Sequence, residues 1–297
     1  MKKTFFYLLT IVAFGFIISS CGDDTPPSVT GEALFSYETD GLTVKFKNES
    51  TVSGKVTYLW DFGDGETSTE KDPVHTYAKK GEYTVTLTVT DEQGGEHKVS
   101  TKIAVDRKAR VSLEDNTVSD WDAVTEPEFV VQLGDNSGIV QAVKFDYDAQ
   151  YVYVYIKFEG TLADSTIFSA VLDTDLDSTG FIPWMWPLMG GDYLMQGQLA
   201  IGDDSWFELY KHTDPNHGWG WEQVQVDNFY VFGGAFEENG SVAYELGLDR
   251  SKVPELNKDK VKIGIFLSNL NWEEVGFAPD QATDDSGPKD GFTLNME

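Results

Sequence analysis

Apolar and polar residues alternate with a period of two over most of the chain beyond residue 31. Such alternation is typical of β-strands that have one buried and one solvated face. No segment shows a convincing helical period, and runs of strands without intervening helices indicate β-sandwiches. The sequence therefore predicts an all-β protein. The clearest strand candidates are 33–37, 42–46, 83–89, 139–147, 151–158, 167–172, 242–248, 261–267 and 292–294.

The first residues of the chain do not follow this pattern. Two lysines, Lys2 and Lys3, precede a short apolar run over 5–18, which indicates a signal peptide over 1–20. Small residues followed by Cys21 resemble the lipobox of bacterial lipoproteins, and this resemblance implies that Cys21 is acylated as the first mature residue. An ordinary signal peptide with an incidental Cys is the alternative. Residues 21–30 then form an acylated spacer, and acyl chains hold the protein to a membrane that it does not cross.

The residues after Cys21 indicate where the protein is located, and the net charge of the chain limits which partners it can bind. Gly22-Asp23-Asp24 resembles an acidic export signal of surface lipoproteins, which implies an outer-membrane anchor facing the cell exterior; a plain linker is the alternative. The chain carries 22 Lys and Arg against 50 Asp and Glu, a formal net charge of −28. This excess of acids argues against DNA, RNA or anionic headgroups as partners, because those surfaces need Lys and Arg.

Residues 31–106 contain a dense set of motifs. The sequence WDFGDG begins at Trp60, HTY begins at His75, and GEYTVTLTV follows shortly after. Together these motifs resemble the PKD domain, which implies an immunoglobulin-like sandwich of seven strands in two antiparallel sheets. The resemblance places Trp60 and Phe62 in the core and gives His75 a local hydrogen bond. It also implies a spacer or interaction module for this segment.

Residues 107–297 carry a looser set of motifs. Asp120-Trp121, the YDAQYVYV stretch that begins at Tyr147, an LDTD loop that ends at Asp175, and a YELGL strand at 244–248 follow one another along the chain. In this order they resemble the family 9-like carbohydrate-binding modules, which implies a larger, jelly-roll-like sandwich that binds sugar. A long Trp-rich insertion after Asp173 departs from that family, so its sugar-contacting residues cannot be carried over.

Five of the eight Trp residues lie between positions 184 and 221. An indole ring offers a large contact area at low entropic cost, and it stacks on the C–H face of a sugar while amides bind the hydroxyls. On an extended backbone both rings of each Trp-X-Trp pair would point to one side. The alternative is that one Trp of each pair is core and the other caps the sandwich. The predicted ligand-binding residues are Trp184, Trp186, Trp206, Trp219, Trp221, Gln196 and Asn216.

An acidic turn follows the predicted strand 167–172. Three carboxylates at every second position resemble the start of a calcium loop, and Ca²⁺ prefers such hard oxygen ligands. Ser178 and Trp184 stand where a complete EF-hand loop needs Gly and a carboxylate, so only an irregular calcium site remains. An acidic turn stabilised by Asx-type hydrogen bonds is the alternative. The candidate metal ligands are Asp173, Asp175, Asp177 and Asp192.

The sequence contains no recognisable catalytic motif. There is no G-x-S-x-G, Walker or Rossmann sequence, and His212 and His217 flank Pro215 in a loop. We therefore expect no enzymatic activity. The predicted function is capture of a neutral glycan by a cell-surface lipoprotein that serves an outer-membrane glycan importer. The alternative is an adhesion or scaffold lipoprotein that binds a protein partner.

Overall fold

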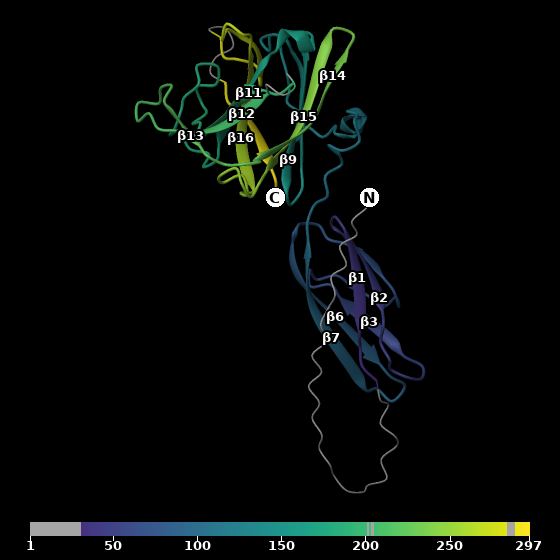
Figure 1. Ribbon diagram of the computed structural model, residues 1–297. Helices are drawn as coiled ribbons and strands as arrows, with labels where there is room; N and C mark the ends of the chain where they lie inside the picture. The colour runs from purple at the N-terminus through teal and green to yellow at the C-terminus, as the bar shows by residue number, and fades with distance from the viewer. Residues whose placement is uncertain (1–30, 201, 203–204, 284–288) are drawn as a thin grey trace.

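The computed structural model describes residues 31–200, 202, 205–283 and 289–297. The signal peptide, Cys21 and the spacer predicted for 1–30 lie outside these residues. Figure 1 shows two β units joined by the segment that follows β7. All named sheet pairings are antiparallel. In the described part of the chain no helix is long and apolar enough to span a membrane. The predicted all-β fold class is confirmed.

The first unit is a sandwich of a three-stranded sheet, β1-β2-β5, and a four-stranded sheet, β4-β3-β6-β7. Trp60 and Phe62 are buried between the sheets, as the resemblance implied. His75 stacks on Phe62 with the ring centroids 4.1 Å apart, and its Nε2 lies 2.7 Å from Asp64 Oδ2, so its hydrogen bond is local. The strands are Phe35–Asp40, Thr43–Asn48, Thr57–Asp61, Thr67–Ser68, Val74–Thr76, Gly81–Thr90 and Glu96–Val105, from β1 to β7.

The second unit packs a four-stranded sheet, β14-β15-β9-β8, against a larger sheet, β13-β12-β11-β10-β16-β17, in which β18 also pairs with β16. Two 3-10 turns, η1 (Ser119–Ala123) and η2 (Leu162–Asp164), lie outside the sheets. The strands are Val140–Tyr147, Tyr151–Glu159, Ile167–Asp173, Tyr193–Gln198, Trp206–His212, Trp221–Val224, Tyr230–Glu238, Ser241–Asp249, Lys260–Ser268, Glu274–Ala278 and Phe292–Asn295, from β8 to β18.

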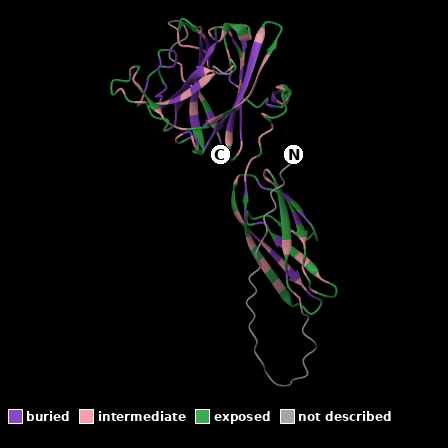
Figure 2. Ribbon diagram, in the orientation of Figure 1, coloured by how far each residue is buried: buried purple, intermediate pink, exposed green. Residues whose placement is uncertain are grey.

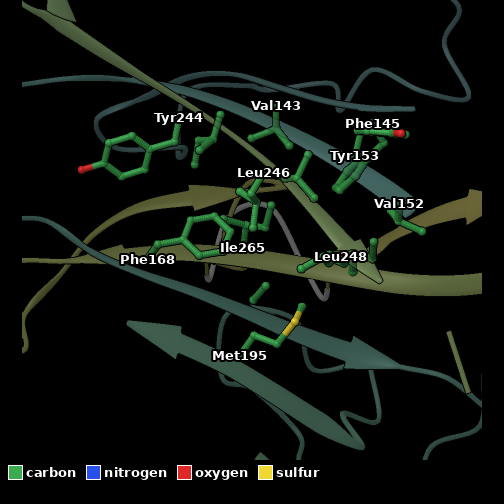
Figure 3. Close-up of a cluster of buried hydrophobic side chains, with 14 of the residues drawn as sticks. Val143, Phe145, Val152, Tyr153, Phe168, Met195, Tyr244, Leu246, Leu248 and Ile265 are labelled. Atoms are coloured by element: carbon green, nitrogen blue, oxygen red, sulfur yellow. The ribbon is translucent and has the colours of Figure 1, made fainter. Parts of the chain in front are cut away.

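The main core of the second unit lies between these two sheets. Val152 and Leu248, which are paired in the small sheet, and Phe168 and Met195 of the large sheet belong to this one buried cluster (Figure 3). Burial is concentrated in the strands of this unit, as the colouring of Figure 2 shows. Because alternate residues of each strand enter the core, the period-two pattern located these strands correctly.

The sequence pattern predicted six strands of the second unit, and each agrees with an observed strand to within one or two residues. It missed β11, β12, β13, β14 and β17. Several of these strands lie in the Trp- and Gly-rich part of the chain, where polar and apolar positions do not alternate cleanly. The missed strands complete both sheets, and β11 to β13 extend the large one around the candidate site.

Candidate functional site

The insertion between β10 and β11, residues 174–192, folds over the outer face of the large sheet. Trp186 is fully buried there, in a second apolar cluster that also contains Phe181, Met189 and Phe266. Its Nε1 donates to the carbonyl of Pro279 at 3.0 Å. Gly264 on β16 makes room for the ring, because a Cβ at that position would lie 2.3 Å from the indole. Trp186 is therefore a core residue, which corrects its prediction as a ligand-binding residue.

The two Trp-X-Trp pairs each divide between surface and interior. Trp184 is 56% exposed whereas Trp186 is buried, because the chain turns here and Trp186 N–H bonds to Pro183 O at 3.1 Å. Trp219 is 59% exposed, and Trp221 is half-buried beside it with the ring centroids 5.7 Å apart. The backbone at 184–186 is not extended, so its two rings do not share one side. This division is the alternative that the sequence left open.

The other three predicted ligand-binding residues differ from one another in burial. Gln196 is buried and its Nε2 donates to Ser169 Oγ at 2.8 Å, so it does not face a ligand. Trp206 is half-buried and donates through Nε1 to Gln198 Oε1 at 3.1 Å. Asn216 is exposed, in the loop that carries Trp219. Of the seven predicted residues, Trp184, Trp219 and Asn216 are left at the surface.

An open pocket of about 550 Å³ lies between the acidic turn and the 213–217 loop. Backbone hydrogen bonds hold this loop to the insertion: Ile182 N–H donates to His217 O at 3.2 Å. The His217 ring nitrogen Nδ1 lies 2.7 Å from Gly180 O. The lining is polar, and acids outnumber lysines. It consists of Thr174, Asp175, Thr179, Gly180, Asp192, Tyr193, Lys211, His212, Thr213, Asp214, Pro215, His217 and Glu255.

Exposed apolar side chains stand near the pocket in the chain, on the 174–192 insertion and just after the 213–217 loop, although none of them is part of its lining. Trp219 packs edge-on against Phe181 with the ring centroids 5.2 Å apart, and Trp184 packs edge-on against Phe277 at 5.6 Å. Ile182 and Leu188 are also exposed. Each Trp is thus held by a neighbouring ring while much of its own surface faces solvent. This combination of large rings and a polar pocket suits a ligand with both C–H faces and hydroxyl groups.

Three of the four predicted metal ligands meet at the edge of the pocket. Single carboxylate oxygens of Asp173, Asp175 and Asp192 lie within 4.8 Å of one another. Burial raises the pKa of Asp173, and desolvation together with the Asp192 charge raises that of Asp175. Lys262 Nζ lies 3.5 Å from Asp173 Oδ2 and offsets part of the negative charge.

Asp177, the fourth predicted ligand, is not part of this group. Its carboxylate accepts the Thr179 N–H at 2.6 Å, and hydrogen bonds from Thr179 lower its pKa. Asp175 accepts the Asp177 N–H at 3.1 Å in the same way. The acidic turn therefore contains the Asx-type bonds of the alternative interpretation alongside the convergent carboxylates.

Several pocket residues were not among those predicted. Tyr193 and Lys211 belong to β11 and β12, which the sequence pattern missed, and they pair directly in the sheet. Glu255 comes from the turn after β15, more than 60 residues from Asp192 in the chain. No local motif marks Glu255, because only the tertiary fold brings it to the pocket.

Comparison with known proteins identifies the first unit. A family model for the PKD domain matches residues 25–105. Collagenase ColQ1 of Bacillus cereus is 34% identical over 130 residues, which are 43% of this chain and 13% of that protein. The pre-pro-metalloprotease PrtV of Vibrio cholerae is 44% identical over 84 residues, 28% of this chain and 9% of that protein. The chain thus spans only a small part of these relatives.

Solved structures give matches in the same region and across the chain. The PKD1 domain of Vibrio cholerae PrtV is 44% identical, covering 26% of this chain and 98% of that one, with a TM-score of 0.25. A structure described as a carbohydrate-binding module of the β-sandwich superfamily is 17% identical, covering 82% of this chain and 97% of that one, with a TM-score of 0.26. Residues 25–105 of this chain are a PKD domain.

Proposed function

We propose that the second unit binds a neutral glycan across Trp184, Trp219 and the adjoining pocket. The observation that carries this proposal is the pair of indole rings, each more than half exposed, on the two loops that border a polar pocket of about 550 Å³. Indole faces stack on sugar C–H surfaces, and carboxylates, backbone groups and Thr hydroxyls accept or donate hydrogen bonds to sugar hydroxyls. No step of this function is catalytic.

The charge of the pocket bears on which glycans it accepts. Asp175, Asp192, Asp214 and Glu255 line it, whereas Lys211 is the lysine in the lining. A uronic acid or a sulfated sugar would bring a further negative charge to this surface and would be repelled. Neutral glycans are therefore the favoured class.

The test is a native affinity-gel screen of soluble residues 22–297 against neutral and acidic polysaccharides. We expect retardation by at least one neutral polysaccharide and by none of the acidic ones. Trp219→Ala should abolish the retardation, whereas Trp272→Ala should leave it unchanged. Trp272 is a matched control because it is 57% exposed but lies in the turn between β16 and β17. Absence of retardation in every gel would contradict the proposal.

Protein binding is the second candidate function. The aliphatic side chains of Ile182 and Leu188 are exposed beside the Trp residues, and exposed apolar surface marks protein contacts as well as ligand grooves. Under this alternative no gel retards the protein, and Leu188→Ser weakens capture of a protein partner. Leu188→Ser should leave glycan binding nearly unchanged if the Trp rings and the pocket carry it.

A bound Ca²⁺ at Asp173, Asp175 and Asp192 is part of the proposal. Ligands of one calcium ion lie about 2.3–2.6 Å from it, so their oxygens are separated by no more than about 5 Å. The three carboxylates meet that condition, and a cation would relieve the desolvation that raises the pKa of Asp173 and Asp175. We expect millimolar CaCl₂ to raise the melting temperature above the value in EGTA. Asp175→Asn should remove that shift, and an unchanged melting temperature in the wild type would contradict the site.

Membrane attachment through Cys21, exposure at the outer surface and service to a glycan importer complete the proposal. Its support is the signal-like start of the chain and the single Cys that follows it. Expression in a Gram-negative host with a labelled fatty acid should label the wild type and not Cys21→Ser. External protease should then digest the labelled protein on intact cells. A wild-type protein without label would contradict the anchor.

A further inference from the structure

A buried carboxylate lies on the outer face of the small sheet, away from the candidate glycan site. On β15 the side chains of Tyr244 and Leu246 enter the main core, so that of Glu245 between them points to the opposite face. Such a face is usually solvated, yet Glu245 is fully buried. The cover comes from residues 109–124, which we call the strap. The strap contributes Val111, Trp121 and Val124 to the hydrophobic cluster of this unit.

Trp121 is the part of the strap that seals Glu245. Its ring stacks on Tyr155 of β9 with the centroids 5.5 Å apart, and its Nε1 donates to Glu245 Oε2 at 3.1 Å. On the other side β14 has a bulge at Gly233, where a Cβ would lie 2.8 Å from Glu245 Oε1. A bulge and a glycine thus make the space in which the carboxyl group is enclosed.

Two buried oxygens in this region are without a hydrogen-bond partner among the described residues: Glu245 Oε1 and Asp120 Oδ1. An ionised carboxylate that is buried with an unpaired oxygen is strongly destabilising. The pKa of Glu245 is raised from its usual 4.5 to about 7, chiefly by burial; the Trp121 hydrogen bond lowers it, and the charges of Asp120 and Asp115 add to the rise. The closed arrangement therefore favours the neutral acid.

The charged groups around Glu245 come mostly from the strap itself. Asp115 and Asp120 raise its pKa, and Asp122, next to Trp121, raises the pKa of Tyr155 on β9. From β8, Lys144 Nζ donates to Trp121 O at 2.8 Å. From β14, Gly233 and Gly234 contribute no charge. Acidic groups therefore dominate around the buried carboxyl.

A proton fits this position better than a metal ion. In the described part of the chain, three metal-ligating side chains converge only at Asp173, Asp175 and Asp192. Glu245 with its strap acids does not offer such a set, whereas one proton suffices to neutralise the single buried carboxylate. The first turn of the strap has a separate anchor, since Arg110 N–H donates to Asp146 Oδ2 at 2.7 Å.

We propose that the strap is a pH-sensitive lock, closed over the small sheet when Glu245 is protonated and released when Glu245 loses its proton. Deprotonation places a negative charge near Asp115 and Asp120 at a fully buried position. The part of the strap that carries Trp121 then moves away from the sheet, while the Arg110–Asp146 hydrogen bond keeps the start of the strap attached. The device is independent of the proposed glycan site, because it lies on the other sheet of the sandwich.

The test is an NMR titration of the Trp121 indole N–H in ¹⁵N-labelled residues 22–297 between about pH 5 and pH 9. Trp121→Phe assigns the resonance. We expect this signal to titrate with an apparent pKa near 7. Hydrogen-exchange protection of the strap amides, corrected for intrinsic exchange, should fall by up to about tenfold per pH unit as pH rises toward 7. In Glu245→Gln both signals should stay in the closed state throughout.

Glu238→Gln is the matched control, because Glu238 is an exposed residue on β14 of the same sheet. It should titrate like the wild type. The four histidines of the chain make their contacts away from the strap. Those contacts are His75 with Asp64, His97 with Asp91, His212 with Gly218 O and His217 with Gly180 O.

Three results would overturn the proposal. A Trp121 signal that does not change across the range in the wild type would show that the strap does not respond to pH. Titration of Glu245→Gln with the wild-type midpoint would assign the response to another group. Restoration of the closed signal at pH 8 by millimolar Ca²⁺, in the wild type but not in Glu245→Gln, would replace the proton with a metal ion.

Discussion

The two outer faces of the second sandwich are each covered by a segment that buries one Trp. On the large sheet the insertion places Trp186 over Gly264, and its Nε1 bonds to the backbone carbonyl of Pro279. On the small sheet the strap places Trp121 over Tyr155, and its Nε1 bonds to the carboxyl of Glu245. One indole has a partner that does not titrate, whereas the other has a partner whose charge depends on pH. Two similarly packed Trp side chains can thus differ in their response to pH, because the acceptor of one indole N–H titrates and that of the other does not.

The largest loss of stability should follow from removing the Trp186 side chain, which covers the large sheet at any pH. Trp186→Ala leaves a cavity the size of an indole in the second apolar cluster, and we expect the free energy of unfolding to fall by about 3–5 kcal/mol. Urea unfolding followed by circular dichroism measures this loss. A loss below about 1 kcal/mol would show that Trp186 does not pack as described.

The switchable cover should make stability depend on pH with a definite sign. The pKa of Glu245 is raised from an ordinary 4.5 to about 7, so the folded state holds this proton more tightly than the unfolded state. The contribution of Glu245 is therefore most favourable below about pH 4.5, and it declines between pH 4.5 and 7 by up to about 3 kcal/mol.

Comparing Glu245→Gln with the wild type isolates this contribution. Gln keeps an oxygen for the Trp121 N–H and has no charge to bury. We expect the difference in free energy of unfolding, variant minus wild type, to grow as pH rises from about 5 to 7 and to level off above it. Urea unfolding at a series of pH values measures the difference. A difference that stays constant over this range would contradict the assignment.

The exposed rings should contribute least to stability. Trp184→Ala and Trp219→Ala each remove a side chain that is more than half exposed, so we expect losses of about 1 kcal/mol or less. The comparison with Trp186→Ala then separates rings that stabilise the fold from rings that are available to a ligand. Urea unfolding of the three variants under one condition makes this measurement, and equal losses would contradict the division.

Strand positions could be predicted from the sequence because each strand sorts its own residues between two faces. Asp173 and Asp192 mark the limit of this: Asp173 ends the predicted strand β10, whereas Asp192 precedes β11, which the pattern missed, and the register that pairs Leu172 with Tyr193 brings the two together. The PKD unit was also predictable, since its motifs are local and its loops are short.

Residues in long insertions could not be sorted in this way. Trp184 and Trp186 are two positions apart, and only the turn at Pro183 and the space over Gly264 decide which ring is buried. Glu245 shows the converse case. Alternation correctly places it on the outer face of β15, but its burial depends on a strap more than 120 residues earlier in the chain. Tertiary packing determines the burial of both Trp186 and Glu245, and it leaves no signal in the local sequence.

Glycan capture by the exposed Trp rings can be tested in a single gel experiment. The double variant Trp184→Ala and Trp219→Ala is run beside Trp272→Ala and the wild type in a native gel that contains the neutral polysaccharide that retards the wild type most. We expect the double variant to migrate as in a gel without polysaccharide, while Trp272→Ala is retarded like the wild type. Equal retardation of all three proteins would contradict this expectation.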